Sequence, residues 1–307
     1  MQSVEARSPA KTSSDNAIVV ANLVKQYGSL RAVDGLSFTV RRGEILALLG
    51  PNGAGKTTTV EILEGYRPAD SGEVRVLGLN PADDGRQLRE RIGLMLQQTG
   101  LYERIRVREA IELFCSYYQQ PRRPDDLITL VGLEHQESTA FQNLSGGQKQ
   151  WLSLALALAG NPELAFLDEP TASLDPQARL QTWEIIVGLR DAGVTVLLTT
   201  HNMEEAQRLA DHVAIIDHGR LIAYGTPDDL TGVSSSEVVT FRAPEGLDLA
   251  GLLALPAGAE VRPEPTRLSP AMPSTPWRLW PSGVKSHKPR WRTCGWSAPP
   301  WKMCSCA

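Results

Sequence analysis

The sequence of 307 residues lacks a long hydrophobic run: no stretch of apolar residues approaches the ~20 that a membrane-spanning helix needs. Its first 16 residues are polar and lack the apolar segment of a secretory signal peptide. These two absences argue against a membrane-spanning chain and against a secreted one. We therefore expect a protein that works in the cytoplasm.

An excess of charge of one sign is missing as well. Lysine and arginine number 31 against 35 aspartate and glutamate residues, the net charge is -4, and like charges do not gather in blocks. A protein that coats nucleic acid needs a strong positive field to hold the phosphate backbone. We therefore expect no nucleic-acid partner.

Cysteine is scarce, with four residues in the chain. Cys115 lies in an apolar stretch of helical periodicity, and we expect it in the core. The other three lie near the C-terminus at positions 294, 304 and 306, without the histidine and cysteine partners that zinc spacing requires. The cysteines therefore do not predict a metal site.

What the sequence does contain is a glycine-rich loop between a strand and a helix. Residues 50–57 fit the pattern G-x-x-x-x-G-K-[ST], after an apolar run (44–49) and before a helix-compatible one (57–64). Backbone N–H groups of such a loop close on phosphate oxygens, and the helix N-terminus adds about half a positive charge. We expect Lys56 to reach the β- and γ-phosphates of a nucleotide and Thr57 to ligate Mg²⁺. The nucleotide ligands expected from this loop are Gly50, Pro51, Asn52, Gly53, Ala54, Gly55, Lys56, Thr57 and Thr58.

Strand-like and helix-like patterns alternate along most of the chain. This alternation predicts an α/β fold with a mostly parallel sheet covered on both faces. A helical stretch between Gln97 and Asn161 interrupts it and should form an inserted subdomain. Strands are expected at 17–24, 36–40, 44–49, 73–77, 92–96, 164–167 and 194–200, with a hairpin at 213–216 and 221–224. Helices are expected at 57–64, 107–119, 125–131, 148–159, 176–190 and 203–210.

A second motif, Leu144-Ser145-Gly146-Gly147-Gln148, opens the helix expected at 148–159. Its glycines leave N–H groups free at a helix start, and Ser145 offers a hydroxyl, so the segment reads as another phosphate-binding element, although alone it could be an N-cap. Together the two motifs make the chain resemble the nucleotide-binding subunit of an ABC transporter over residues 17 to about 230. The resemblance implies a P-loop NTPase (RecA-like) core, an antiparallel β subdomain and a helical subdomain at about 98–160.

The resemblance also implies the chemistry of two strand ends. Asp168 and Glu169 end a buried strand: Asp168 should hold Mg²⁺, directly or through water, and Glu169 should polarise the attacking water. Paired carboxylates at a strand end can otherwise be caps. His201 follows another apolar strand, as the switch histidine of the family does, and should bond the γ-phosphate and hold Glu169; a single histidine in such a place is otherwise unremarkable.

Three more positions match motifs of the family. Gln97 matches the Q-loop, a contact to Mg²⁺ or water that also senses the membrane partner, although an isolated glutamine is usually a surface residue. Asp175 closes Ser173-Leu174-Asp175, which matches the D-loop that reaches across a dimer. Tyr27 matches the aromatic residue that stacks on adenine; the alternative is a core aromatic at a strand end.

The assembly follows from the same resemblance. Two subunits, a homodimer or a pair of related chains, sandwich two Mg-ATP molecules head to tail, with residues 145–148 of each facing the nucleotide of the other. Hydrolysis opens the pair. The work goes to a separate integral membrane permease that docks around residues 97–108, which places the chain on the cytoplasmic side of the membrane as a peripheral subunit.

Residues 58–66, 92–98 and 99–103 resemble the drug- and antibiotic-export ATPases of the ABC-2 type, the daunorubicin-resistance-like group. The resemblance implies export of a drug-like or hydrophobic compound. Two alternatives stay open: a soluble ABC ATPase that is not a transporter, and an impaired remnant. Trp151 stands where the family usually has arginine, and Arg106 where it often has a capping threonine. Trp151 either packs beneath the helix that the second motif opens or weakens coupling to nucleotide.

The two ends of the chain differ from residues 17–230 in composition and in the periodicity of their apolar residues. We expect a disordered tail at 1–16, a small extension at 231–262 and an aberrant, disordered tail at 263–307 in which tryptophan, proline and arginine follow no period. Read one base earlier, codons for 301–306 permit Leu-Glu-Asp-Val-Phe-Leu, which resembles the closing motif of drug-export ATPases. We hypothesise a frameshift, natural or from sequencing; the alternative is a divergent tail that docks on a partner.

Overall fold

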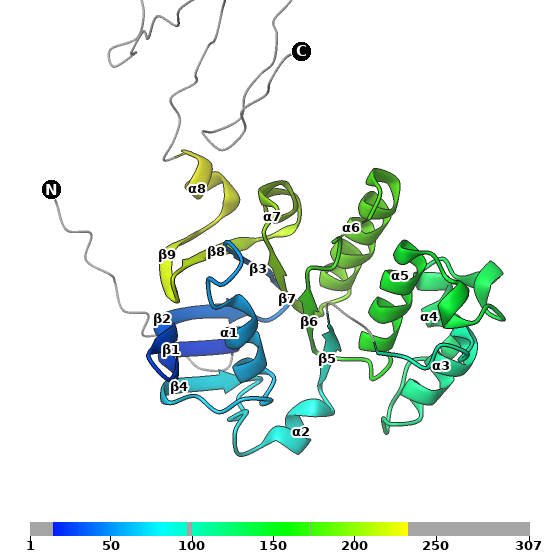
Figure 1. Ribbon diagram of the computed structural model, residues 1–307, viewed down its shortest axis with the longest axis horizontal. Helices are drawn as coiled ribbons and strands as arrows, with labels where there is room; N and C mark the ends of the chain where they lie inside the picture. Colours follow the sequence, from blue (N-terminus) through cyan, green and yellow to red (C-terminus); the bar gives the residue numbers. More distant parts are fainter. Residues whose placement is uncertain (1–14, 97–99, 173, 233–307) are drawn as a thin grey trace, which may run out of the picture. The chain divides into compact units, whose positions relative to one another are not determined.

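The computed structural model describes residues 15–96, 100–172 and 174–232, nearly all within one compact unit that ends at Leu230 (Figure 1). Its main sheet has six strands, of which the first five are parallel and the last is antiparallel to its neighbour. In spatial order they are β5 (Ile92–Met95), β6 (Leu164–Asp168), β7 (Thr195–Thr200), β3 (Ile45–Leu49), β8 (His212–Asp217) and β9 (Arg220–Gly225). The predicted α/β fold with a mostly parallel sheet is confirmed.

Both faces of the main sheet are buried, which explains the continuous apolar runs of its strands. Successive side chains of a strand point to opposite faces. In β3, Ile45, Ala47 and Leu49 therefore pack against the helices on one side, while Leu46 and Leu48 join a second core on the other side. The glycine-rich loop thus leaves a strand that is anchored on both faces.

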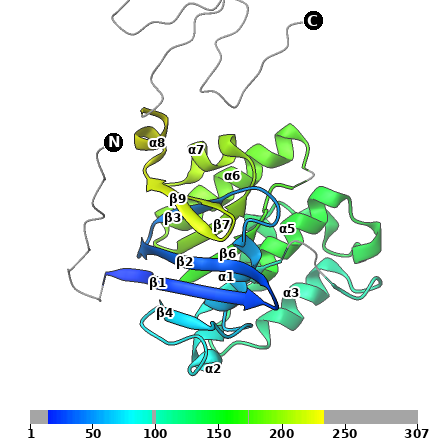
Figure 2. The ribbon, with the colours of Figure 1, turned by 60° about the vertical axis from the view of Figure 1, so that its left-hand side comes forward.

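The second core is closed by a three-stranded antiparallel sheet (Figure 2). The alternation predicted at residues 36–40 is present: Leu36, Phe38 and Val40 are buried, and Ser37 is exposed. The sheet has the order β2 (Leu30–Arg41), β1 (Asn16–Tyr27) and β4 (Ser71–Val76), and α1 (Lys56–Leu63) contacts β2 and β4.

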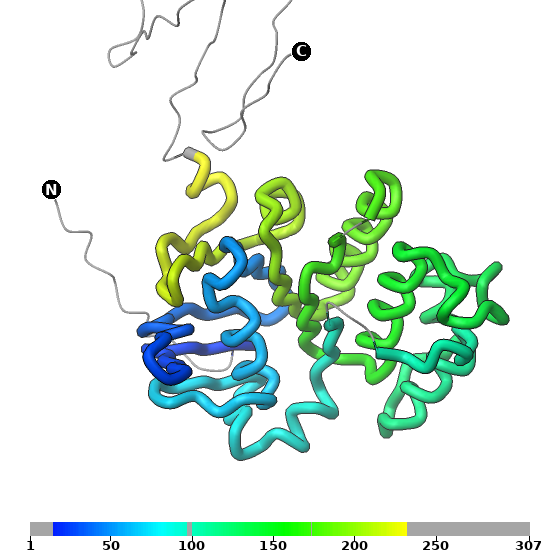
Figure 3. Tube along the Cα trace, in the orientation of Figure 1, coloured from blue at the N-terminus to red at the C-terminus, as the bar shows by residue number. Residues whose placement is uncertain are grey.

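The helical insert lies beyond the main sheet on the side away from the antiparallel sheet (Figure 3). It contains α3 (Val107–Cys115), α4 (Pro124–Leu130) and α5 (Gly146–Ala157). Helix α3 is shorter than predicted, because the N–H groups of Tyr117 and Tyr118 bond carbonyls three residues back and tighten the last turn. Cys115 is buried there, as predicted.

The remaining helices are α2 (Gly85–Arg89), α6 (Pro176–Asp191), α7 (Met203–Leu209) and α8 (Pro227–Gly232). Patterns in the sequence did not predict α2 and α8, which have five and six residues and are too short for a helical period to show. No helix in the described ranges is both long and apolar enough to cross a lipid bilayer.

Trp151 and Arg106, the two residues that depart from the expected motifs, each have a local structural explanation. Trp151 packs against the core of the helical side, and its indole Nε1 donates to the Thr182 hydroxyl at 3.0 Å, which ties α5 to α6. Arg106 is the N-cap of α3 without a capping side chain, and the Glu109 carboxylate accepts from its N–H at 3.0 Å instead.

Several predictions fall outside the described residues and stay predictions. They are the N-terminal tail (1–14), Gln97, Ser173, and everything from 233 to 307, including the frameshift hypothesis and the three cysteines of the tail.

Candidate nucleotide-binding site

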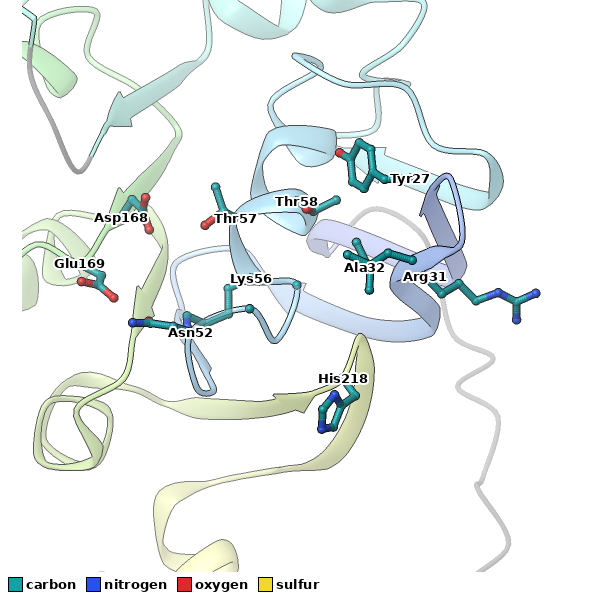
Figure 4. A pocket seen from close by; sticks show the side chains of 13 residues that line it. Tyr27, Arg31, Ala32, Asn52, Lys56, Thr57, Thr58, Asp168, Glu169 and His218 are labelled. Atoms are coloured by element: carbon teal, nitrogen blue, oxygen red, sulfur yellow. The ribbon is translucent and has the colours of Figure 1, made fainter.

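A cleft of about 550 Å³ lies where β3 passes into α1 and where β6 ends (Figure 4). It brings together residues of both predicted groups, the glycine-rich loop and the paired carboxylates. The lining residues are Tyr27, Leu30, Arg31, Ala32, Asn52, Gly53, Gly55, Lys56, Thr57, Thr58, Asp168, Glu169 and His218. A cleft of this size, with both charged side chains and backbone of a glycine-rich loop in its lining, fits a small polar ligand.

Two glycines of the loop cannot be replaced without moving it. Gly55 has φ +101°, and a Cβ there would lie 2.3 Å from the Ala32 carbonyl oxygen. A Cβ at Gly50 would lie 2.3 Å from the Ile216 carbonyl oxygen. The loop is therefore packed closely between β2 and β8, and Gly53 and Gly55 of the loop line the cleft. This arrangement suits backbone N–H groups that bind phosphate oxygens.

Lys56 is the first residue of α1 and is only 7% exposed. Its Nζ donates to the carbonyl oxygens of Gly50 at 2.7 Å and Pro51 at 3.0 Å. Burial lowers the pKa of Lys56, and the charges of Glu169 and Asp168 oppose that shift. The cation therefore stands inside the loop, where it faces the carboxylates across the cleft.

Asp168 and Thr57 face each other in the cleft (Figure 4). The Thr199 hydroxyl, on the neighbouring strand β7, donates to Asp168 Oδ1 and orients the carboxylate. A carboxylate and a hydroxyl are hard oxygen ligands of the kind Mg²⁺ prefers, and Mg²⁺ usually takes few protein ligands because phosphates and water complete its shell. Among the described residues, no group of three or more His, Cys, Asp or Glu side chains could hold a metal ion. The pair therefore fits Mg²⁺ bound together with a nucleotide.

Glu169 sits directly after β6 and contacts His201, which follows β7. His201 Nδ1 lies 3.0 Å from Glu169 Oε1. The backbone of Glu169 has φ +49°, a conformation that non-glycine residues rarely adopt, and its N–H donates to the Thr199 carbonyl at 3.1 Å. The unusual backbone turns the carboxylate toward the cleft and the histidine, so the structure brings together two residues that are 32 positions apart.

Tyr27 lies at the other end of the cleft from the carboxylates (Figure 4). Its ring is 39% exposed, with Lys25 Nζ at 5.7 Å and the Arg67 guanidinium carbon at 5.8 Å from the ring centre. A partly exposed aromatic ring beside a phosphate-binding loop is a group on which a base can stack.

The cleft also includes residues that no motif names, among them His218 in the turn between β8 and β9. In that turn the Gly219 N–H donates to the Ala54 carbonyl at 2.9 Å, and the Gly219 carbonyl accepts from the Asp34 N–H at 2.8 Å. The turn therefore holds the glycine-rich loop against β2. Residues 217–220 read as a hairpin turn in the sequence, but such a pattern does not say what the turn packs on.

The second motif and the D-loop residue do not line this cleft. Ser145 caps α5: its hydroxyl accepts from the Gln148 N–H at 3.2 Å, and Gln148 Oε1 accepts from the Ser145 N–H at 2.9 Å. Asp175 caps α6 by accepting from the N–H groups of Gln177 and Ala178, both at 2.9 Å. Within one chain these residues are helix caps, and Gly146 and Gly147 form the first turn of α5.

A buried carboxyl beside the site gives a test by pH. Glu64, after the last turn of α1, is 8% exposed; burial raises its pKa from 4.5 to about 8, and the charges of Asp168 and Glu61 add to the shift. Between these two pH values the unfolded chain releases a proton that the folded chain keeps, so stability falls as the pH rises. Glu64→Gln removes this loss. The variant should gain little over the parent at about pH 5 and on the order of 2–4 kcal/mol by about pH 8, as urea unfolding without nucleotide would measure.

The control for this experiment is Glu73→Gln, because Glu73 is largely exposed. Its effect on stability should be small at every pH. A gain from Glu64→Gln that is the same at both pH values would contradict the raised pKa.

Comparisons with known proteins agree with this geometry. The chain matches the family model described as ABC transporter over residues 33–172. It is 42% identical to a Nod factor export ATP-binding protein of Ralstonia nicotianae over 69% of this chain and 67% of that protein. It is 38% identical to a daunorubicin resistance ATP-binding protein of Streptomyces coeruleorubidus over 78% of each.

The fold is also similar to the folds of solved ABC transporter structures. The structure of an ATP-binding subunit of an ABC transporter aligns with a TM-score of 0.65 and 30% identity, over 71% of this chain and 92% of the other. A dimeric bacterial ABC transporter cassette aligns with a TM-score of 0.61 and 25% identity, over 68% of this chain and 98% of the other.

Proposed function

The chain belongs to the ABC transporter family and is an ATPase subunit of it, and we propose that it powers export of a drug-like or hydrophobic compound through a separate membrane subunit. The observation that carries the catalytic part of this proposal is the convergence of Lys56, Asp168 and Glu169 on one cleft, with His201 in contact with Glu169.

The cleft has a polarity that orients ATP. The adenine stacks on Tyr27, and the phosphates lie on the loop at residues 50–58 with Lys56 at the β- and γ-phosphates. Thr57 and Asp168 would hold Mg²⁺, with Gln97 as a further contact, and the ion supplies neutralisation of charge on the phosphates.

The reaction itself needs a water molecule placed next to the γ-phosphate. Glu169 accepts a hydrogen bond from that water and takes its proton as the water oxygen bonds to the γ-phosphorus and the bond from this phosphorus to the bridging oxygen breaks, which releases ADP. His201 fixes the carboxylate through Nδ1 and offers its other ring nitrogen toward the γ-phosphate. Glu169 is therefore the general base and His201 its partner.

Hydrolysis requires a second subunit in this proposal. Ser145, Gly146, Gly147 and Gln148 do not line the cleft of their own chain, although the start of α5 is suited to bind phosphate. Two chains placed head to tail would bring these residues, and the segment around Asp175, to the nucleotide of the partner. The existence of a dimeric cassette of the same fold supports this arrangement.

The proposed class of exported compound is based on the names of the relatives. Two of them are named for resistance to daunorubicin or for export of Nod factor, and a third, from Bacillus subtilis, is named for linearmycin resistance. We therefore propose a role in export of antibiotics or similar compounds, with the chain held at the cytoplasmic face of the membrane by its permease.

The permease contact can be tested at an exposed tyrosine. Tyr102 lies within the proposed docking segment, residues 97–108, and is 83% exposed; Leu96, directly before that segment, is 56% exposed. We propose that the permease covers them. After purification from membranes the parent chain should bring an integral membrane protein with it, and Tyr102→Ala should reduce the recovery of that protein at least fivefold by burying less apolar area. Its basal ATP hydrolysis should stay at the parent level.

The matched control is Tyr117→Ala, which removes another exposed tyrosine outside residues 97–108. Full recovery of the membrane protein with Tyr102→Ala would contradict the docking site, and recovery of none with the parent chain would contradict the proposed partnership.

A further inference from the structure

Two loops carry the proposed catalytic pair, and they are held together at two points. The first loop, residues 169–172, follows β6 and carries Glu169; the second segment, residues 201–205, follows β7, carries His201 and enters α7. The first point of contact is the pair itself, with 3.0 Å between His201 Nδ1 and Glu169 Oε1. The second lies below it, between Thr171 and Glu205.

Glu205 is a buried carboxylate that the reaction described above does not use. It is 1% exposed and lies in α7. Its Oε1 accepts from the Thr171 hydroxyl at 2.7 Å and from the indole Nε1 of Trp183 at 3.3 Å. Both donors are themselves buried, at 6% and 3% exposure. One oxygen thus joins the first loop, α6 and α7.

The two contacts differ in strength. The side chain of His201 is 62% exposed, so water competes with its hydrogen bond to Glu169, and the net contribution of this contact is about 1 kcal/mol or less. A buried hydrogen bond to a charged group contributes about 1.5–3 kcal/mol, and removing one partner costs more because the other remains unsatisfied. The contact between Thr171 and Glu205 is therefore the stronger of the two.

The path from this contact to the catalytic pair is short. Thr171 is two residues from Glu169, and the turn between them is closed by the Ala172 N–H, which donates to the Glu169 carbonyl at 3.0 Å. On the other side, Glu205 is four residues from His201. The side chain of Asn202 accepts from the Glu204 N–H at 2.9 Å, which fixes the start of α7. On both sides, therefore, only a few residues, tied by a hydrogen bond, separate the contact from the catalytic pair.

Helix α7 is also clamped to α6. The Arg208 guanidinium carbon lies 5.1 Å from the centre of the Trp183 ring, and the same indole donates to Glu205. Residues 205 and 208 lie on one face of α7, three positions apart. Helix α6 therefore acts as a fixed support for the contact.

We propose that Glu205 is a positioning residue for ATP hydrolysis, which sets the separation of Glu169 and His201 through Thr171. The inference rests on the roles proposed above for Glu169 and His201. The Thr171 hydroxyl, which donates the hydrogen bond to Glu205, is the other group that this positioning requires.

Variants of Thr171 test the proposal with little change of shape. Thr171→Val keeps the volume and removes the donor, and Thr171→Ser keeps the donor. With the full chain, kcat for ATP hydrolysis should fall about tenfold to a hundredfold in Thr171→Val, because a catalytic group displaced by 1 Å costs ~100-fold. The KM for ATP should change less than about twofold, since the glycine-rich loop and Lys56, which hold most of the phosphate contacts in the proposed complex, are not touched. Thr171→Ser should restore kcat to within about threefold of the parent.

Glu205→Ala should reproduce the loss of kcat, and the double variant should lose no more than the worse single one, because both remove the same interaction. The ATP-bound dimer should persist longer in Thr171→Val, since hydrolysis is what opens it. Thr182→Val is the matched control: it removes another buried threonine hydroxyl, the acceptor of Trp151, from the interface of α5 and α6. Its kcat should stay within about twofold of the parent.

The proposal is overturned if Thr171→Val keeps the parent kcat, if Thr182→Val loses as much kcat as Thr171→Val, or if KM rises in step with the loss of kcat. Glu169→Gln, measured in the same series, distinguishes an error in the proposed role of Glu169 from an error in the proposed role of Glu205. If Glu169→Gln keeps turnover, the proposed base is wrong; if it stops turnover while Thr171→Val does not slow it, only the role of Glu205 is wrong.

Discussion

Replacing Lys56 by alanine is expected to abolish ATP hydrolysis and to weaken ATP binding. The Lys56 ammonium group is 7% exposed and stands inside the loop that holds the phosphates. It is the cation nearest to the γ-phosphate in the proposed complex, and a charge-assisted hydrogen bond in a buried place contributes about 1.5–3 kcal/mol to ATP binding. Extra charge develops on the transferring group, so the loss in kcat/KM should exceed the loss in affinity and reach about a thousandfold.

Phosphate release and titration with a fluorescent ATP analogue measure the two effects separately. Lys56 also bonds the carbonyls of Gly50 and Pro51, so thermal unfolding without nucleotide must show that the variant is folded. Lys56→Arg should not rescue hydrolysis, because the planar guanidinium does not fit a place shaped for an ammonium group. Turnover at the parent rate in Lys56→Ala would contradict the assignment of the loop.

Replacing Glu169 by glutamine should separate binding from chemistry. The amide keeps the shape and the contact range to His201, but it cannot take a proton from water. Loss of a general base slows a reaction by about a hundredfold to ten-thousandfold, and we expect hydrolysis to fall by that factor. The affinity for ATP should stay within about threefold of the parent, because Glu169 is placed to act on water rather than to hold the phosphates.

The same substitution should trap the assembly. ATP favours the closed pair because its phosphates contact both subunits there, and hydrolysis removes those contacts. Without hydrolysis, the closed pair should accumulate. Loss of the dimer in Glu169→Gln at saturating Mg-ATP would contradict this coupling.

Much of the fold was open to prediction because its signals are local. Strand β3 is apolar at every position and is followed by Gly50, and the hairpin of β8 and β9 is marked by a four-residue turn. The short helices α2 and α8 were missed, because five or six residues carry too few apolar positions to reveal a helical period.

The site was open to prediction only where a motif carries it. Lys56, Asp168 and Glu169 belong to motifs with fixed spacing, and the cleft contains all three. The contact from Thr199 to Asp168 depends on the register of β6 against β7, in which these two residues are direct partners. A shift of one residue would turn Thr199 to the other face, and no local pattern specifies that register.

The burial of Glu205 could not be predicted from the sequence either. In the sequence it is one of two adjacent glutamates at the start of a helix, and such residues are usually exposed. Its neighbour Glu204 fits that expectation, whereas Glu205 is buried against two donors from other elements. Only the packing of α7 on α6 distinguishes them.

The measurement that tests the account most directly is the molar mass and nucleotide content of Glu169→Gln in Mg-ATP, by size exclusion with light scattering followed by quantification of the bound nucleotide. The account predicts a dimer that holds two molecules of ATP, not ADP, and that returns to monomer when Lys56→Ala is added to the same chain. A monomer in saturating ATP with phosphate release at the parent rate would contradict both the role of Glu169 and the proposed pairing of the two subunits.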